Sequence, residues 1–293
     1  MQVTESGTHV LGSQDVGEGS AAGREYGAKG NGIPMLAAQR QARILEEVQR
    51  AGGVRVNDLT RLLGVSDMTV RRDLDVLDQR GLITKVHGGA TVRRSGSIDE
   101  PAFTVKAEME QPAKDAIARR AAALVRPGTA VGISGGSTTF SLARHLVGIP
   151  DLTVVTNSLR VAEVLHSHDA KQTVILTGGM RTPSEALVGP IAVQAIRTLH
   201  LDQVFLGVYG LDPTAGFTSP NLMESETNRA LVAAARSLVV VADHTKWGVV
   251  GLSAFAALAE AAVLVTDDGM PGDARGLLAE EVGELVIADR GDS

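Results

Sequence analysis

Residues Val54 to Ala90 read VRVNDLTRLLGVSDMTVRRDLDVLDQRGLITKVHGGA, and this stretch decides the fold of the first part of the chain. Its first half predicts a helix that begins at the cap Asn57 and turns three leucines inward, Leu59, Leu62 and Leu63. Gly64 then permits a tight turn, because glycine adopts left-handed backbone conformations without strain. Ser66 is a favoured cap for a second helix, which we expect to end at Arg80.

The second helix presents two different faces when its residues are placed at 100° intervals. One face is apolar and predicts a core contact through Val70, Leu74 and Leu77. The opposite face offers hydroxyl groups of Ser66 and Thr69, guanidinium groups of Arg71 and Arg72 and the apolar Met68, all near the helix start. Such groups suit base edges and phosphates in a DNA major groove. The later residues Asp73, Asp75 and Asp78 are acidic, so only the first half of the helix suits DNA.

Two short alternating segments, 82–86 and 90–92, follow Gly81 and predict a β-hairpin around His87. Lys85, His87 and the earlier Arg55 are available for phosphates. Helix, turn, helix and hairpin in this order indicate a winged helix-turn-helix domain that binds double-stranded DNA. The alternative is a helical hairpin whose charged face contacts a protein partner.

An apolar stripe at helical spacing precedes the helix-turn-helix and predicts a further helix of the same domain. Leu36, Ile44, Leu45 and Val48 recur at roughly helical spacing between residues 35 and 52.

The segment VSDMTVRRDLDVLDQRGLITKVHGGA closely resembles the DNA-binding signature of the DeoR family of bacterial transcriptional repressors. The resemblance implies that the chain regulates transcription and that it represses.

Length and composition indicate a two-domain globular protein. With 293 residues, the chain exceeds what one hydrophobic core usually supports. It has 44% apolar and 21% charged residues and no cysteine, which fits a reducing compartment. There is no apolar run long enough for a membrane span and no signal-peptide pattern, so we expect a cytoplasmic protein.

Positive charge is confined to one segment. Residues 35–95 carry 11 Lys and Arg against 7 Asp and Glu, a local charge of +4, within a chain whose net charge is −6. Phosphate binding needs only a local field, so the acidic total does not exclude DNA. We expect a disordered tail over 1–34, the DNA-binding domain over 35–93, a linker over 94–113 and a second domain over 114–293.

Strands and helices alternate in the second domain. After a helix over 114–125, candidate strands cover 130–134, 152–156, 173–177, 203–208, 238–242, 262–266 and 285–287. Candidate helices cover 138–147, 158–167, 191–199, 224–236 and 273–281. Continuous apolar strands with intervening helices predict an α/β fold with a mostly parallel sheet covered on both faces. Ligands bind such sheets beyond the carboxyl ends of the strands.

Polar and small residues follow several of these strands. The first strand leads into a glycine-rich loop and a helix start, which together suit an anion, Gly135, Gly136, Ser137, Thr138 and Thr139. The loop lacks the Gly-Lys-Ser/Thr ending of a nucleotide-binding P-loop. Later strand ends add possible cations and hydroxyl-binding groups, Asn157, Arg181, Asp212, Glu224 and Lys246. A phosphorylated sugar or polyol fits this set of groups.

This second half also resembles the effector domain of the DeoR family, which is similar in fold to ribose-5-phosphate isomerase and to amino-sugar-phosphate deaminases. The resemblance implies a phosphosugar inducer bound at 135–139, Asn157, Asp212 and Lys246. Two positions depart from the pattern. Ser134 stands where family members often have Asp, and Tyr209 replaces the first acid of the isomerases' Asp-Gly-Ala-Asp loop.

Losing one of two carboxylates weakens proton transfer but leaves binding possible. We therefore expect a site that binds without turnover, with an isomerase- or deaminase-like enzyme as the alternative. The seven histidines show no paired metal-ligand spacing, so we expect no metal and no cofactor. A two-part operator would be read by a homo-oligomer, either a dimer or a tetramer.

Overall fold

The computed structural model describes residues 36–92, 103–166 and 172–291. The tail predicted over 1–34 and residues 94–102 of the linker predicted over 94–113 lie outside these ranges. Within them, the part up to residue 92 and the part from residue 103 onward are each described separately.

The first part has the predicted winged helix-turn-helix order. Its elements are α1 (Ala37–Ala51), β1 (Gly53–Arg55), α2 (Val56–Leu63), α3 (Asp67–Gln79), β2 (Ile83–Val86) and β3 (Gly89–Val92). Gly64 ends α2 in the left-handed conformation at φ 64°, as the tight turn required. Helix α2 begins two residues earlier than predicted, because Arg55 and not Asn57 occupies the cap position. Asn57 therefore lies inside the helix.

The three helices and the small sheet close over one apolar core. Its fully buried residues include Ile44, Leu59, Val70, Leu74, Leu77 and Ile83. Two predictions about this core were wrong. Leu36 precedes α1 and is 69% exposed, and Leu62 lies on the outer side of α2 and is 48% exposed. Strand β1 joins the hairpin strands in the order β1-β3-β2, so the wing has three strands rather than two.

The second part is built around a parallel sheet of seven strands in the order β15-β14-β12-β9-β4-β5-β6. These are the seven strands predicted from the sequence, β4 (Ala130–Ile133), β5 (Thr153–Thr156), β6 (Thr173–Leu176), β9 (Gln203–Gly207), β12 (Leu238–Val241), β14 (Ala261–Asp267) and β15 (Leu285–Ala288). Every neighbouring pair is parallel, which confirms the α/β prediction.

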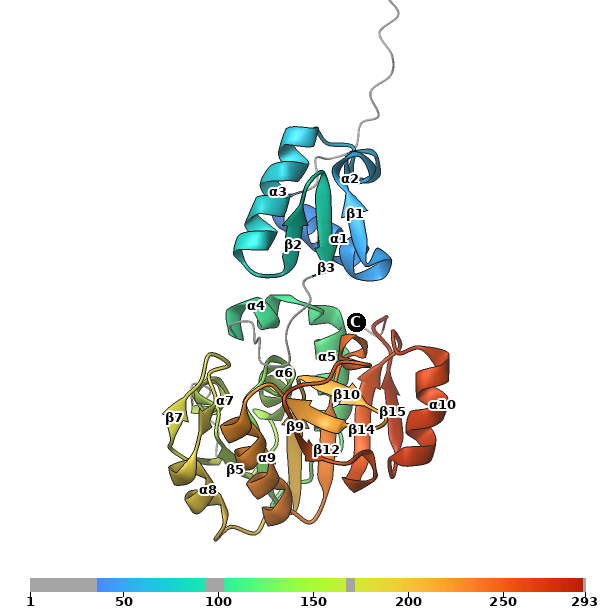
Figure 1. Ribbon diagram of the computed structural model, residues 1–293. Coiled ribbons are helices and arrows are strands. Elements are labelled where there is room, and N and C mark those ends of the chain that lie inside the picture. The colour runs from blue at the N-terminus through green and yellow to red at the C-terminus, as the bar shows by residue number, and fades with distance from the viewer. Residues whose placement is uncertain (1–35, 93–102, 167–171, 292–293) are drawn as a thin grey trace, which may run out of the picture. The chain divides into compact units, whose positions relative to one another are not determined.

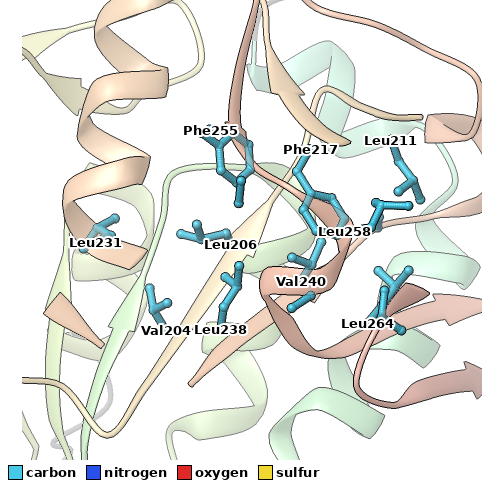
Figure 2. Packing of buried hydrophobic residues seen from close by; sticks show 14 of the residues in the cluster. Val204, Leu206, Leu211, Phe217, Leu231, Leu238, Val240, Phe255, Leu258 and Leu264 are labelled. Carbon is cyan, nitrogen blue, oxygen red and sulfur yellow. The ribbon is translucent and has the colours of Figure 1, made fainter. Parts of the chain in front are cut away.

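Helices cover both faces of the sheet. One face packs against α5 (Gln111–Ala122), α6 (Ser137–Leu146) and α7 (Leu159–His166). The other packs against α8 (Pro190–Ile196), α9 (Leu222–Ala234) and α10 (Gly272–Glu281). Figure 2 shows the second of these cores, where Phe217 and Phe255 stack at 6.3 Å between ring centroids. Burial on both faces explains why the strands are continuously apolar.

Several short elements were not predicted. Helix α4 (Phe103–Glu108) lies in the range taken as linker, and Phe103 packs edge-to-face on Phe140 at 5.5 Å. Two small antiparallel sheets are formed by β7 (Met180–Arg181) with β8 (Leu187–Val188), and by β10 (Gly210–Asp212), β11 (Gly216–Ser219) and β13 (Ser253–Ala256). Strands β7, β8 and β10 have only two or three residues, which is too short for a visible periodicity, and β11 and β13 lack the continuous apolar run of the predicted strands.

Candidate functional site

The start of α3 presents an exposed surface of mixed chemistry. Met68 is 79% exposed, and Arg71 and Arg72 are also exposed. The Ser66 hydroxyl caps the helix, accepting a hydrogen bond from the Thr69 backbone N–H at 3.2 Å. It also lies 2.8 Å from the Thr69 hydroxyl, so these two hydroxyls are engaged with each other.

The two arginines differ in their surroundings. Arg71 forms a hydrogen-bonded ion pair with Asp67 one turn earlier, and this bond raises the pKa of the Arg71 guanidinium. For Arg72, the described part of the chain shows no ion pair. A guanidinium that is already exposed and needs no other bond broken is the better candidate for a base edge.

The acidic residues of α3 hold the domain together. Asp73 is buried, which corrects the prediction that it lies on the exposed face, whereas Asp75 is partly exposed and Asp78 is exposed. Asp73 is buried at 3% exposure, where it accepts a bond from Arg40 Nη2 at 3.2 Å and one from the Gln41 amide at 3.1 Å. Asp78 accepts a bond from the Lys85 backbone N–H at 3.0 Å, and Asp75 pairs with the Lys85 ammonium. These acids fasten α1 and the wing to α3.

Glycines of the β2–β3 hairpin allow it to pack closely against β1. A Cβ on Gly89 would lie 2.1 Å from the Val54 carbonyl oxygen, so only glycine fits there. The Val56 N–H donates to the Gly88 carbonyl at 2.9 Å. Arg55 pairs with Gly89 in the sheet register, which places it beside the exposed turn at His87. Two exposed cationic or polar groups therefore flank the tip of the wing.

A polar crevice lies in the second part of the chain, at the carboxyl ends of β4 and β9. Its lining comes from α4, from the loop after β4, from the end of β9, from α9 and from the 3₁₀ turn η1 (His244–Lys246), namely Lys106, Gly135, Gly136, Ser137, Thr138, Gly207, Val208, Tyr209, Glu224 and Lys246. The chain runs from β4 outward to β6 and then returns to β9 on the other side. The crevice thus sits at the topological switch point, where such sheets bind ligands.

The crevice offers an anion site. Helix α6 begins at Ser137, so its free backbone N–H groups and positive dipole end point toward the loop. Lys106 and Lys246 bring two ammonium groups, and Glu224 brings a carboxylate that can accept bonds from hydroxyls. Of the residues predicted to bind an effector, the structure brings Gly135, Gly136, Ser137, Thr138, Glu224 and Lys246 together in this lining.

Asn157 supports the crevice from beneath. Its side chain is fully buried; the carbonyl oxygen accepts a bond from the Gly135 N–H at 2.8 Å, and the amide donates to the Leu187 carbonyl at 3.0 Å. A Cβ on Gly135 would lie 2.6 Å from the Cβ of Ala186, so this glycine serves close packing. Ser134 accepts a bond from the Gly207 N–H at 3.2 Å and so ties β4 to β9.

Three other predicted residues do not line the crevice. Thr139 is buried and donates to the Gly136 carbonyl at 3.0 Å. Arg181 is exposed on β7 and pairs with Glu185, a bond that raises the pKa of the arginine. Asp212 caps the β10–β11 turn by accepting bonds from the N–H groups of residues 214 and 215, at 2.8 and 2.9 Å.

Lys106 is the charged lining residue that the sequence prediction missed. Gly207, Val208 and Tyr209 also line the crevice and were not among the predicted effector-binding residues. Lys106 lies on α4, which is fixed by the buried Lys114 of α5. The Lys114 ammonium donates to the backbone carbonyls of Lys106 and of Met109, the latter at 2.5 Å. Burial lowers the pKa of Lys114 to about 8. The buried Phe103 three residues before Lys106 was the available signal for a short helix here.

Family models match both the helix-turn-helix part and the α/β part of the chain. A model of the DeoR-like helix-turn-helix domain matches residues 40–95, and a model of the DeoR C-terminal sensor domain matches residues 109–268. The chain therefore belongs to the DeoR family. It is a DNA-binding transcriptional regulator and not an enzyme of the isomerase type.

Curated relatives match over nearly their whole length. The chain is 35% identical over 256 residues to an uncharacterized HTH-type transcriptional regulator YgbI of Escherichia coli (strain K12), covering 87% of this chain and 99% of the relative. It is 38% identical to the HTH-type transcriptional regulator GlpR of Haloferax volcanii, covering 86% and 98%. A putative aga operon transcriptional repressor of Escherichia coli O157:H7 is 30% identical, covering 85% and 93%.

Solved structures give a weaker likeness. A ribose-5-phosphate isomerase in complex with phospho-erythronic acid matches with a TM-score of 0.36 and 17% identity, covering 47% of this chain and 54% of that one. Among the described residues, there is no helix with the length and apolar character needed to cross a bilayer.

Proposed function

We propose that this chain represses a sugar or carbohydrate operon and that a phosphorylated sugar controls its binding to the operator DNA. The observation that carries the proposal is the crevice at the switch point. It combines a helix N-terminus, two lysines and one carboxylate in a chain that also carries an exposed recognition helix. The aga operon relative, a putative repressor by its name, supports the direction of control.

On the DNA side, we assign base contacts to the start of α3 and phosphate contacts to the wing. Arg72 and Met68 are the exposed residues that we place against base edges. The remaining candidates position the domain on phosphates or hold the helix, Arg55, Ser66, Thr69, Arg71, Lys85 and His87. The pairing of Lys85 with Asp75 reduces its expected share of the phosphate binding.

On the effector side, we assign the phosphate to the loop and helix start. Backbone N–H groups of residues 136–138 and the ammonium of Lys246 would hold the phosphate, with Lys106 beside it. Glu224 would accept bonds from sugar hydroxyls. The crevice encloses about 40 Å³, so a sugar phosphate would enter by displacing the lysine side chains. Asn157 acts through the loop that it holds.

The proposal also covers the domain boundaries, the cellular location and the assembly. We assign residues 35–93 to DNA binding and 114–293 to effector binding, in a cytoplasmic homo-oligomer. Within the range 94–113 predicted as the connection, we assign α4 to the effector-binding part, because Lys106 lines the crevice. We assign it no cofactor or metal. The isomerase alternative is not favoured, because Tyr209 lines the crevice where an acid would be needed for proton transfer.

Two experiments test the two halves. The purified protein should retard a fragment of its own upstream promoter region at moderate salt, with an affinity that falls steeply as salt rises. Failure to retard that fragment would count against regulation of its own promoter. A thermal-shift screen should find sugar phosphates that raise the melting temperature through mass action.

Lys246→Ala should abolish that rise, whereas Arg236→Ala should keep it. Arg236 is 84% exposed in its side chain and lies outside the crevice, so it is the matched control for loss of a positive charge. A rise that survives Lys246→Ala would remove this lysine from the proposed site. Measurable turnover of the same sugar phosphates would favour the enzyme alternative.

A further inference from the structure

A group of large apolar side chains is exposed on one side of the second part of the chain. Ile191 on α8 is 67% exposed, Leu222 and Met223 on α9 are 58% and 42% exposed, and Met180 on β7 is 51% exposed. Monomeric proteins rarely leave a contiguous patch of this kind in water unless it binds something. We call these four residues the apolar face.

The side chains of the apolar face adjoin one another. A Cβ on Gly189 would lie 3.2 Å from Met180 Cε and 3.6 Å from Met223 Sδ, so both methionines flank one backbone position. A Cβ on the nearby Gly178 would lie 3.6 Å from a methyl group of Ile191. The face continues onto the sheet edge, where β6 exposes Ile175 and Leu176 at 39% and 42%.

Charged residues are rare in the segments that carry this face, although Arg181 follows Met180 on β7 and Glu224 follows Met223 on α9. Residues 172–180, 186–196 and 213–223 contain no Asp, Glu, Lys or Arg, although 21% of the whole chain is charged. Depletion of charged residues and enrichment of methionine are what distinguish the core of a protein–protein interface from ordinary surface. Opposite charges lie beyond it on the same helices, with Arg197 on the α8 side and Glu226 on α9.

We infer that the apolar face binds a second copy of this chain. A two-fold contact places the same patch on both partners, so the patch must be complementary to itself. An uncharged apolar patch meets this condition, because its copy brings no like charge, whereas a charged patch would repel its copy. The edge strand β6 beside the face has its outer backbone groups unpaired within the sheet, and they could pair with the same edge of the copy.

The inference rests on the proposed function, since a two-part operator needs two recognition helices. The contact also lies next to the effector crevice. In the first turn of α9, Met223 belongs to the apolar face and its neighbour Glu224 lines the crevice. A standard interface buries roughly 800 Å² on each partner, so the four residues would form its centre and not its whole extent.

Sedimentation of the full-length protein across a range of concentrations tests the inference. The unmodified chain should sediment as a dimer or a larger assembly at micromolar concentration. Ile191→Asp and Leu222→Asp should each raise the dissociation constant by on the order of 100-fold or more, because the two-fold axis brings like charges together. Both residues are mostly exposed, so the fold should survive, and circular dichroism checks this.

Two variants make the result specific. Leu62→Asp adds the same charge to an apolar residue of similar exposure outside the face and should leave the assembly intact. Lys246→Ala should also stay assembled, so loss of the effector response and loss of the interface are separate outcomes. The inference is overturned if the unmodified chain is monomeric, or if the two Asp variants assemble as it does. It is equally overturned if Leu62→Asp dissociates as they do.

Discussion

The recognition helix and the strand-end crevice are opposite kinds of surface. The first is convex and local, since Met68 and Arg72 lie within one turn of each other and both are exposed. The second is concave, and its lining spans residues 106 to 246 of the chain. The crevice also depends on fully buried neighbours such as Asn157, whereas the outer face of α3 depends on little beyond its own helix.

This difference decides what a mutation can reveal. A substitution on the outer face of α3 changes an interaction with DNA and leaves the fold alone. A substitution around the crevice changes the scaffold as well, so a loss of effector response has two possible causes. The most informative experiments therefore separate exposed residues from buried ones within each region.

The largest expected effect belongs to the buried side of α3. Asp73→Ala leaves the partly buried Arg40 guanidinium, whose side chain is 14% exposed, without its carboxylate. Breaking a buried pair costs about 3–5 kcal/mol, so amide exchange in α1 and α3 should accelerate by on the order of 100-fold or more. Hydrogen exchange followed by mass spectrometry measures this in the full chain.

Asp58→Ala is the matched control, because Asp58 forms an exposed ion pair with Arg61 at 3.7 Å on α2. An exposed pair contributes at most about 1 kcal/mol. Equal acceleration in both variants would show that Asp73 is no more structural than a surface acid. The comparison between outer and inner faces of α3 would then fail.

The next largest effect belongs to the support of the crevice. Asn157→Ala leaves the Gly135 N–H and the Leu187 carbonyl without their side-chain partner in a buried site. Two such losses should lower the free energy of unfolding by about 2–4 kcal/mol. Urea denaturation followed by circular dichroism measures the change.

Asp212→Ala also removes two bonds to backbone N–H groups, but water can replace them at that turn, where residue 214 is exposed. We expect a loss below about 1 kcal/mol. Asp212 lies outside the crevice lining, so the thermal shift by sugar phosphates should persist. Loss of that thermal shift in a folded Asp212→Ala protein would show that Asp212 takes part in effector binding.

How far the sequence could lead differs between the two regions for a physical reason. The helical spacing of α3 and the apolar runs of the seven strands are local patterns, so both were predicted with errors of one or two residues at their ends. The burial of Asp73 was not predictable from the helical wheel, because it depends on Arg40 from α1. Lys106 was missed because its place depends on the packing of Phe103 against Phe140 and on the bond from Lys114 of the next helix.

A smaller effect is expected at the outer face. Arg72→Ala should weaken specific operator binding by about 1–3 kcal/mol and relax the preference at one base position. The fold should be unaffected, since the side chain is exposed. Fluorescence anisotropy with the operator and with single-base variants measures both changes.

Arg50→Ala removes the same charge from α1, where Arg50 pairs with Glu47 and is 75% exposed in its side chain. Its effect on operator binding should stay within about 0.5 kcal/mol. If both variants weaken binding uniformly across sequences, Arg72 contributes only phosphate attraction. Base recognition would then have to come from elsewhere on α3 or the wing.

The smallest effect concerns a charge pair behind the crevice. His244 lies 2.8 Å from the buried Asp267 carboxylate, and this hydrogen bond raises the pKa of His244 above its ordinary value of 6.5. The stabilisation is therefore fully present below about pH 6.5 and is lost as pH rises through the higher pKa of the folded state. His244→Gln should reduce the free energy of unfolding by about 1 kcal/mol at pH 6 and by less at pH 9. Urea denaturation of both proteins at the two pH values provides the test, and a difference that stays constant would show that the pair does not titrate in this range.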